Sequence, residues 1–343
     1  SNLMKESPPL DLFTAVYQTL HLKLHKGSRA FCFSPNEEFF AIASVDGKIT
    51  AFPFLKTRNT VFNRQVIHGG MVKPSRANKL GHINVFCETK TGFFITAGSD
   101  GSLKILNREN KDPHFTLPNA HSAEILAMCL SPDELYLVTG GADKRFRIFN
   151  YENGETLTPD FMSKELSGND YHKYNFLDAV VSVAISNDSS LLCVGIRGGT
   201  LQILNFSSRG IIKVIMGSGG PVILIIISKL LVSSISANLT ISHDNQLIFV
   251  GNDSGAVNIF RTSTFEEEEP IYNLKQVNHK YFSKLLAPIS ALTISRDGNY
   301  LVGGSKDSAI KVFDLNVGKT IMLEPPRDQS KLFLGLSYFS QTR

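Results

Sequence analysis

The sequence predicts an all-β protein, a β-propeller whose antiparallel blades close into a ring. Two observations predict this fold. A phrase of short apolar strands recurs six times along the 343 residues, and the last strand of each copy alternates between apolar and polar residues. One copy cannot bury both of its faces, so the copies are expected to stack side by side and close into a ring.

The repeated phrase has a constant order. An apolar strand ending in Ser is followed by an Asn or Asp turn, a second apolar strand ending in small residues, a tight turn and a third strand. The tight turns are spaced by about 43 to 55 residues, near the roughly 40 to 45 of a propeller blade. We expect a single domain over residues 1–343, with repeats at 29–52, 83–107, 121–150, 180–205, 237–260 and 289–314.

Each element of the phrase has a physical reason. The middle strands are apolar on both faces, as strands stacked between neighbouring blades must be. The third strands alternate, as in Lys104, Ile105 and Leu106. Asp-Gly and Asp-Ser corners suit two-residue hairpins, where positive φ favours Gly, Asn and Asp. The segments from Thr14 to Leu24 and from Lys331 to Phe339 are the candidates for a seventh blade.

Composition narrows the class of protein. The formal net charge of +4 is small for this length, so no global basic field points to nucleic acid or an anionic membrane. The stretch from Pro221 to Ala237 is shorter than the roughly 20 residues of a membrane helix and contains Lys229, so we expect two buried strands there and no transmembrane segment. The N-terminus has no basic region followed by an apolar one, so nothing suggests secretion.

The cysteines predict an intracellular protein. They lie inside apolar strands, without a CxxC pair and without a His at ligand spacing, at Cys32, Cys87, Cys129 and Cys193. Buried, reduced thiols are the expected state, and the localisation is therefore expected to be cytoplasmic or nuclear.

No enzyme motif is present. The sequence has no P-loop, HExxH, GxSxG or EF-hand pattern, and the nine His residues are scattered. The recurrent glycines fall at strand ends, where they serve turns and close packing, at Gly98, Gly140, Gly195, Gly251 and Gly304. We expect no catalytic residue, no metal site, no cofactor and no small-molecule substrate.

The repeats resemble those of the WD-repeat family from about Leu20 to Asp314. The resemblance implies seven four-stranded blades, with the ring closed by strands from the N- and C-termini that share the last blade. The chain departs from the family in having no Trp. Apolar residues fill that position, namely Phe52, Leu106, Phe149, Leu204, Phe260 and Phe313. The Gly-His that opens a family repeat survives only as Ala120-His121. His121, Thr139 and Asp143 are expected to form a structural hydrogen-bond network.

The resemblance also implies partner binding at the mouth of the central channel. The residue before each tight-turn position and a residue near the start of each first strand are expected to line that rim. These positions are Val45, Ser99, Ala142, Arg197, Asn252 and Lys306, with Arg29, Asn84, Leu126, Val181, Ala237 and Ser290. Basic Arg29, Arg197 and Lys306 beside apolar Leu126 and Val181 would suit an acidic peptide with an apolar anchor.

Three long polar stretches join the repeats, and long loops on a rigid scaffold commonly carry function. The stretch 56–80 has no acidic residue and holds a possible anion-binding set, Lys56, Arg58, Arg64, Lys73, Arg76 and Lys79. The stretch Tyr151 to Phe176 is mixed in character. The third contains Glu266 to Glu269, which either keeps the loop soluble or meets a basic partner.

Two functions are therefore weighed. The first is a non-enzymatic scaffold subunit of a multiprotein complex that binds peptide segments through the rim and loops. The alternative is an RNA- or phosphoinositide-associated propeller that uses the basic stretch 56–80, whose binding would depend on salt. An enzyme would need a pocket with a cluster of perturbed titratable groups, and the sequence offers no candidate cluster.

Overall fold

The structure is a computed structural model, and it describes the sheets and many of their connections. The described residues are 28–33, 39–44, 47–53, 62–65, 82–107, 113–157, 176, 178–208, 210–216, 235–242, 244–252, 257–264, 289–294, 299–305, 310–315 and 319–323.

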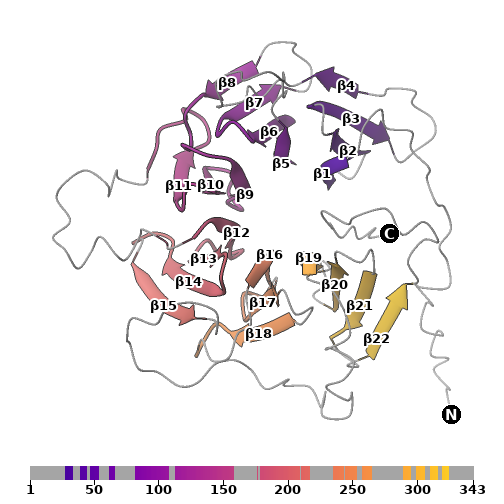
Figure 1. Cartoon of the computed structure of the whole chain (residues 1–343), viewed down its shortest axis with the longest axis vertical. Helices are drawn as coiled ribbons and strands as arrows, with labels where there is room; N and C mark the ends of the chain where they lie inside the picture. The colour runs from indigo at the N-terminus through magenta and orange to yellow at the C-terminus, as the bar shows by residue number, and fades with distance from the viewer. Residues whose placement is uncertain are drawn as a thin grey trace, which may run out of the picture.

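These residues form six antiparallel sheets arranged around a common centre (Figure 1). The first three sheets contain β1 (Ser28–Phe33), β2 (Phe39–Ser44), β3 (Lys48–Pro53) and β4 (Phe62–Gln65); β5 (Ile83–Glu88), β6 (Phe93–Gly98), β7 (Leu103–Asn107) and β8 (Pro113–Leu117); and β9 (Ile125–Leu130), β10 (Tyr136–Gly141) and β11 (Phe146–Asn150). The last three contain β12 (Val180–Ile185), β13 (Leu191–Ile196), β14 (Thr200–Asn205) and β15 (Ile211–Met216); β16 (Ile235–Ile241), β17 (Leu247–Asn252) and β18 (Val257–Arg261); and β19 (Ile289–Ile294), β20 (Tyr300–Ser305), β21 (Ile310–Asp314) and β22 (Lys319–Leu323).

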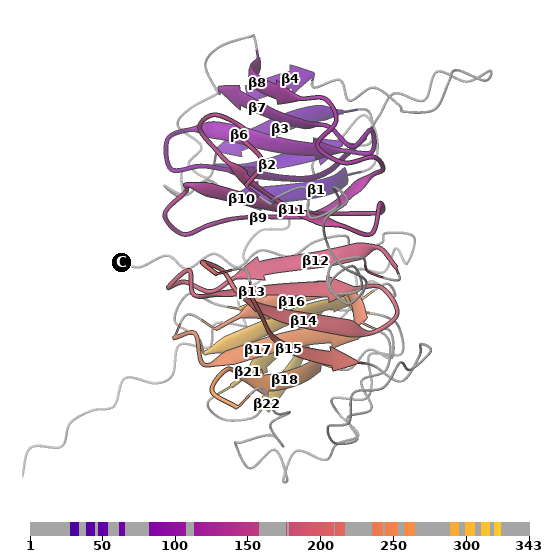
Figure 2. The ribbon, with the colours of Figure 1, turned by 90° about the vertical axis from the view of Figure 1, so that its left-hand side faces the viewer.

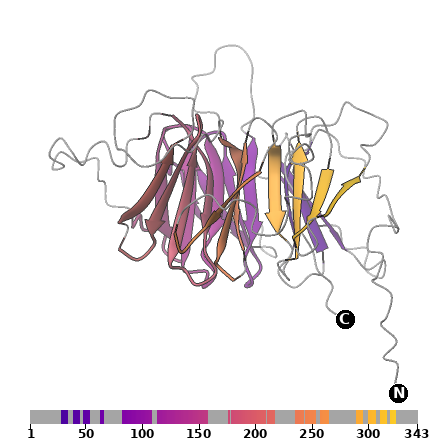
Figure 3. The same ribbon diagram turned by 90° about the horizontal axis from the view of Figure 1, so that it is seen from below.

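Each sheet is a meander whose first strand lies innermost (Figure 1). The first strands contact one another in the order β1, β5, β9, β12, β16 and β19. Figure 2 shows the third and fourth sheets facing each other, in agreement with the contacts of β12 with β9 and β10. Seen from below in Figure 3, the strands run between two faces of the ring, so the turns gather on those faces. This is the arrangement of a β-propeller.

The hydrophobic core lies between the blades. Five clusters of buried residues join successive sheets, one cluster for each of the five interfaces. The middle strands serve two clusters at once: in β6, Phe94 packs toward the first sheet and Ile95 toward the third. In β17, Phe249 faces the sixth sheet while Ile248 faces the fourth. The predicted two-sided burial of the middle strands is confirmed.

The residues that occupy the family's Trp position are buried. Leu106, Phe149, Leu204, Phe260 and Phe313 are almost fully buried, and Phe52 is partly buried against Phe40, with ring centroids 5.3 Å apart. An apolar side chain thus fills the space at the end of each third strand. Packing is retained there, but the indole N–H that a Trp would donate is lost.

The outermost strands include one that the sequence analysis placed in a loop. Residues 62–65 form β4, which pairs with β3 between Lys48 and Gln65, so the stretch 56–80 is not a continuous loop. The reason is that an outermost strand needs only one apolar face, and Phe62-Asn-Arg-Gln meets that need with a single apolar residue. Arg64 therefore belongs to the first blade.

A seventh blade stays a prediction. The segments assigned to it, Thr14 to Leu24 and Lys331 to Phe339, lie outside the described residues. The first sheet nevertheless has a second apolar face, because Phe40 and Ile42 alternate with Ala41, which packs toward the second sheet. Such a face is what a strand between two blades requires.

No helix in the described part of the chain is long and apolar enough to cross a membrane. Of the apolar stretch from Pro221 to Ala237, residues 235–237 belong to β16, and the rest lies outside the described ranges. The four cysteines carry free thiols: Cys32 and Cys193 are buried, and Cys87 and Cys129 are partly buried.

Candidate functional site

The first strand of every sheet is irregular near its start. In five sheets one residue bulges between two paired neighbours, so that two residues oppose one on the middle strand. The bulged residues are Arg29, Asn84, Leu126, Val181 and Ser290. In the fifth sheet, pairing resumes only at Leu239 after Ile235, which places Ala237 in the unpaired part. The first-strand positions predicted for the rim are therefore the bulged or unpaired positions.

A backbone hydrogen bond joins each described tight turn to the start of the first strand. The N–H of Ser99 donates to the carbonyl oxygen of His82 at 2.9 Å, that of Ala142 to Glu124 at 2.8 Å, and that of Arg197 to Ala179 at 2.9 Å. In these three blades the two predicted sets of rim positions thus meet at one corner. In the second, third and fourth blades the pairs are Ser99 with Asn84, Ala142 with Leu126, and Arg197 with Val181.

The rim side chains differ in exposure. Arg197 is exposed, while Asn84, Ser99, Leu126 and Ala142 are partly buried. Val181 is only 7% exposed, so it adds little surface to the rim. The side-chain amide of Asn84 donates to the carbonyl oxygen of Ile125 at 3.0 Å and so ties the second blade to the third.

The remaining rim positions are known only in part. Arg29, Ala237, Asn252 and Ser290 lie in β1, β16, β17 and β19. Val45 and Lys306 lie outside the described residues.

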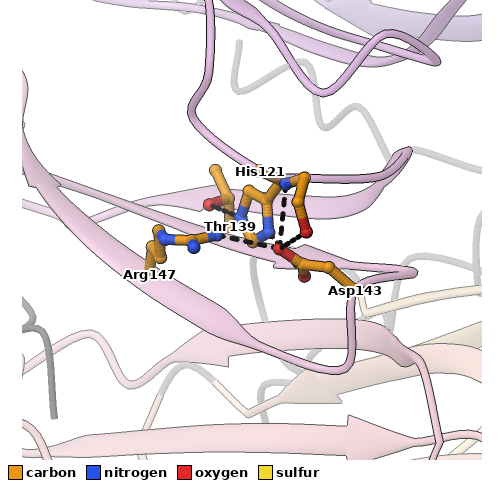
Figure 4. A network of polar contacts seen from close by, with 5 residues as sticks. His121, Thr139, Asp143 and Arg147 are labelled. Carbon is orange, nitrogen blue, oxygen red and sulfur yellow. Dashed lines mark hydrogen bonds and ion pairs between the residues drawn. The ribbon is translucent and has the colours of Figure 1, made fainter. Parts of the chain in front are cut away.

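A buried polar network supports the rim in the third blade (Figure 4). Nδ1 of His121 lies 2.9 Å from Oδ1 of Asp143, and Nε2 lies 2.7 Å from Oγ1 of Thr139. Oδ2 of Asp143 accepts hydrogen bonds from Nη1 of Arg147 at 3.0 Å and from the N–H of Ser122 at 3.1 Å. The predicted network of His121, Thr139 and Asp143 is confirmed.

The protonation states in the network follow from burial and charge. Burial of the ring lowers the pKa of His121 below its ordinary value, against the opposing effect of Asp143. Hydrogen bonds from His121 and Arg147 hold the pKa of Asp143 well below its usual range, although burial acts the other way. Because a carboxylate only accepts, the neutral ring donates from Nδ1, and Nε2 accepts from the Thr139 hydroxyl. The hydrogen bonds among His121, Thr139, Asp143 and Arg147 make the network a structural clamp.

Sequence reasoning missed two members of the network, Arg147 and Ser122. Strand alternation was the available signal for Arg147, since it is the partner of Thr139 across β10 and β11 and shares its face. Nothing in the repeat pattern singles out Ser122, because it contributes chiefly a backbone N–H.

The predicted anion-binding set cannot be assembled as one loop. Arg64 lies in β4, and Lys56, Arg58, Lys73, Arg76 and Lys79 lie outside the described residues. The acidic run Glu266 to Glu269 is outside them as well. Across the described ranges, no group of three or more His, Cys, Asp or Glu side chains is placed to hold a metal ion.

Comparison with known proteins points to one family. The family model described as WD domain, G-beta repeat, matches residues 112–150 and 279–314. The first match covers β9 to β11 and contains the whole network. The chain is 25% identical, over 136 residues, to the U3 small nucleolar RNA-associated protein 12 of Saccharomyces cerevisiae. The matched residues make up 38% of this chain and 14% of that protein.

A second relative is the Restriction of telomere capping protein 1 of Candida dubliniensis, 44% identical over 43 residues, or 12% of this chain and 4% of that protein. The matches therefore span only a small part of these relatives. With six meander sheets around a centre, the described part of the chain is a β-propeller, and two of its segments, 112–150 and 279–314, match the WD-repeat model.

Proposed function

We propose that the chain, as one propeller domain of residues 1–343, is a non-enzymatic scaffold subunit that holds peptide segments of other proteins at its rim. One observation carries the proposal: the bulged first-strand residue and the tight-turn residue meet at the same corner in successive blades. A bulge changes the direction of one side chain while the rest of the strand stays paired. The corners of successive blades therefore present different residues on the same rigid scaffold.

The charges at the rim favour an acidic peptide with an apolar anchor. Arg197 is exposed at the corner of the fourth blade, and Lys144 is exposed on the tight turn of the third. Leu126, partly buried at the corner of the third blade, offers the apolar contact. A carboxylate on the peptide would gain charge-assisted hydrogen bonds from Arg197.

The test is a crosslinking pull-down from native lysate with Arg29, Arg197 and Lys306 all changed to Glu. Loss of a defined protein partner would support rim docking. The matched control is Lys213→Glu, which reverses a charge on the outermost strand β15, away from the corners. If the rim variant keeps every partner of the wild type, the rim proposal is wrong.

A second candidate function is association with RNA. The name of the Saccharomyces cerevisiae relative associates that protein with U3 small nucleolar RNA, and the stretch 56–80 of this chain is basic without an acidic residue. Phosphate contacts of this kind weaken steeply with salt. The measurement is filter binding of polyuridine RNA and sedimentation with phosphoinositide vesicles, across a salt series, for wild type and the Arg58→Gln, Arg64→Gln, Arg76→Gln triple variant. Unchanged binding in the variant would contradict this role.

The scaffold proposal places the protein in the cytoplasm or nucleus. Free thiols at Cys32 and Cys193 inside the core suit a reducing compartment. Catalysis is not part of the proposal, because the titratable groups of the clamp are all engaged with one another.

A further inference from the structure

An exposed leucine stands on the face of the ring opposite the rim. Leu135 is 46% exposed, and the other exposed large hydrophobic side chain in the described part of the chain is Ile212, at 42%. It ends the turn between β9 and β10, whereas the rim begins at the other end of β9. A six-residue strand separates the two faces by about 17 Å.

The fold does not need a leucine at this position. The same turn recurs in the next two blades, with Ser190 and Gln246 in place of Leu135. In all three, the N–H of this residue donates to an Asp two positions earlier, at distances of 3.0 to 3.1 Å. Its carbonyl oxygen accepts the N–H that follows the third strand, from Tyr151 in the case of Leu135. The turn is therefore held by backbone and Asp contacts, and polar side chains serve there equally well.

A rigid acidic loop lies beside Leu135. The N–H of Tyr151 donates to the carbonyl oxygen of Leu135 at 3.0 Å, which places the next residue, Glu152, beside the leucine. Oδ1 of Asn150 accepts the N–H groups of Glu152 and Asn153, at 2.8 and 3.3 Å. Oδ1 of Asn153 accepts the N–H of Glu155 at 2.9 Å. The loop that carries Glu152 and Glu155 is thus fixed before any partner arrives.

Packing against the second blade also holds the loop Tyr151–Glu155 in place. Gly154 has φ of +69°, and a Cβ there would lie 1.8 Å from the ring of Phe115 in β8. The close approach locks the loop of the third blade onto the outermost strand of the second. Tyr151, partly exposed, packs edge-on against Phe93 with ring centroids 6.4 Å apart, which holds the start of the loop against the second blade.

The charge around this leucine is negative. Asp133, Glu152 and Glu155 are exposed. Oε1 of Glu134 accepts the N–H of Lys90 at 2.8 Å, and the Lys90 ammonium donates to the carbonyl oxygen of Pro132 at 3.1 Å. We propose that Leu135 and the acidic loop Tyr151–Glu155 dock a lysine- or arginine-rich segment of another protein that inserts one apolar side chain beside the leucine.

This docking surface does not depend on the rim. The fold holds an acidic, preorganised loop beside Leu135, whose side chain is 46% exposed among the described residues. A basic amphipathic segment can contact the carboxylates and the leucine at the same time. Preorganisation reduces the ordering cost of binding. Electrostatic attraction increases the association rate and orients the incoming segment, and Leu135 provides the contact for its apolar side chain.

The test uses a fluorescein-labelled peptide of alternating lysine and leucine, with lysine–serine and glutamate–leucine peptides as matched probes. Fluorescence anisotropy with wild type should show binding of the lysine–leucine peptide alone. Leu135→Ser should weaken that binding about tenfold, from the loss of one apolar contact. Since Ser190 occupies the same place in the next blade, the variant should melt at the wild-type temperature.

Two further variants separate the contributions. Glu152→Gln with Glu155→Gln should weaken binding at low salt and flatten its salt dependence, because neither carboxylate holds the loop together. Ile212→Ser, the control at the other exposed hydrophobic residue, should leave binding unchanged. Equal affinity of wild type and Leu135→Ser would overturn the proposal. So would sedimentation showing a wild-type dimer that Leu135→Ser converts to monomer, because a second copy would then be the occupant.

Discussion

Nδ1 of His121 lies 2.9 Å from Oδ1 of Asp143, and this contact fixes the segment before β9 to the tight turn of the third blade. The ring bonds within the third blade, while the backbone N–H of the same His121 donates to the carbonyl oxygen of Gly101 in the second blade at 2.9 Å. A change at either residue therefore acts on the interface between blades as well as on the turn.

Asp143→Ala should destabilise the protein by about 2 to 4 kcal/mol, because His121 and Arg147 lose their shared acceptor in a buried site. Urea unfolding followed by circular dichroism measures this. Lys144→Ala, a change at the exposed neighbour, should stay within about 0.5 kcal/mol of wild type. Equal effects of the two substitutions would show that the clamp contributes nothing to stability.

The free energy of unfolding should fall as the pH drops below about 6.5, in part through His121. Its pKa is lowered in the folded protein, so the unfolded chain takes up a proton at a higher pH than the folded chain does. Stability from this residue is thus present above the unfolded pKa and is lost at lower pH. Comparing urea unfolding at about pH 7 and about pH 5.5, the wild type should lose more stability than His121→Gln. Identical losses would contradict the assignment of a neutral buried ring.

Two glycines with positive φ should respond differently to alanine. At Gly101, with φ of +73°, a Cβ would lie 2.3 Å from the carbonyl oxygen of His121, which is backbone and cannot turn aside. At Gly92, with φ of +82°, nothing lies within 4 Å. Gly92→Ala should therefore cost about 1 kcal/mol, from backbone strain alone, and Gly101→Ala clearly more. Thermal melts of both variants provide the comparison, and a milder effect at Gly101 would be inconsistent with this packing.

The thiols should react slowly in the native protein. Burial raises the pKa of Cys87 and of Cys193 to about 12, and it raises the pKa of Cys32 and Cys129 as well. Because the thiolate is the reactive form, Ellman's reagent should label the folded protein at least about a hundredfold more slowly than free cysteine. Denaturant should release all four thiols. Rapid labelling of a native thiol would show that its strand opens readily.

Most of the fold could be predicted because the apolar pattern of each repeat reflects which strand faces are buried between blades. The three strands around His121, Leu137 and Asn150 follow the predicted order, as do those of the other five repeats. The outermost strands were harder to predict. β4 looks polar and β8 begins with Pro113, since a strand with one packed face and one free edge needs little apolar content.

The positions of the corner residues could be predicted from the sequence better than their burial could. The strand register is the same in both sheets, so Asn84 and Leu126 lie at equivalent bulges, as their equivalent places in the repeat suggest. Burial did not follow from the repeat, and Val181 lies mostly inside. Nothing in the sequence indicates that Leu135 is exposed, because an apolar residue just before a strand is usually part of the core. Its exposure is evident only from the structure, in which the side chain is 46% exposed.

The bulges at the start of the first strands have an evolutionary consequence. A residue that stands outside the ladder, as Asn84 or Leu126 does, can be exchanged without shifting the pairing of the residues below it. On the proposed function, duplicated genes with this architecture can acquire new binding partners by single substitutions at exposed corners, while the strand pairing beneath stays unchanged.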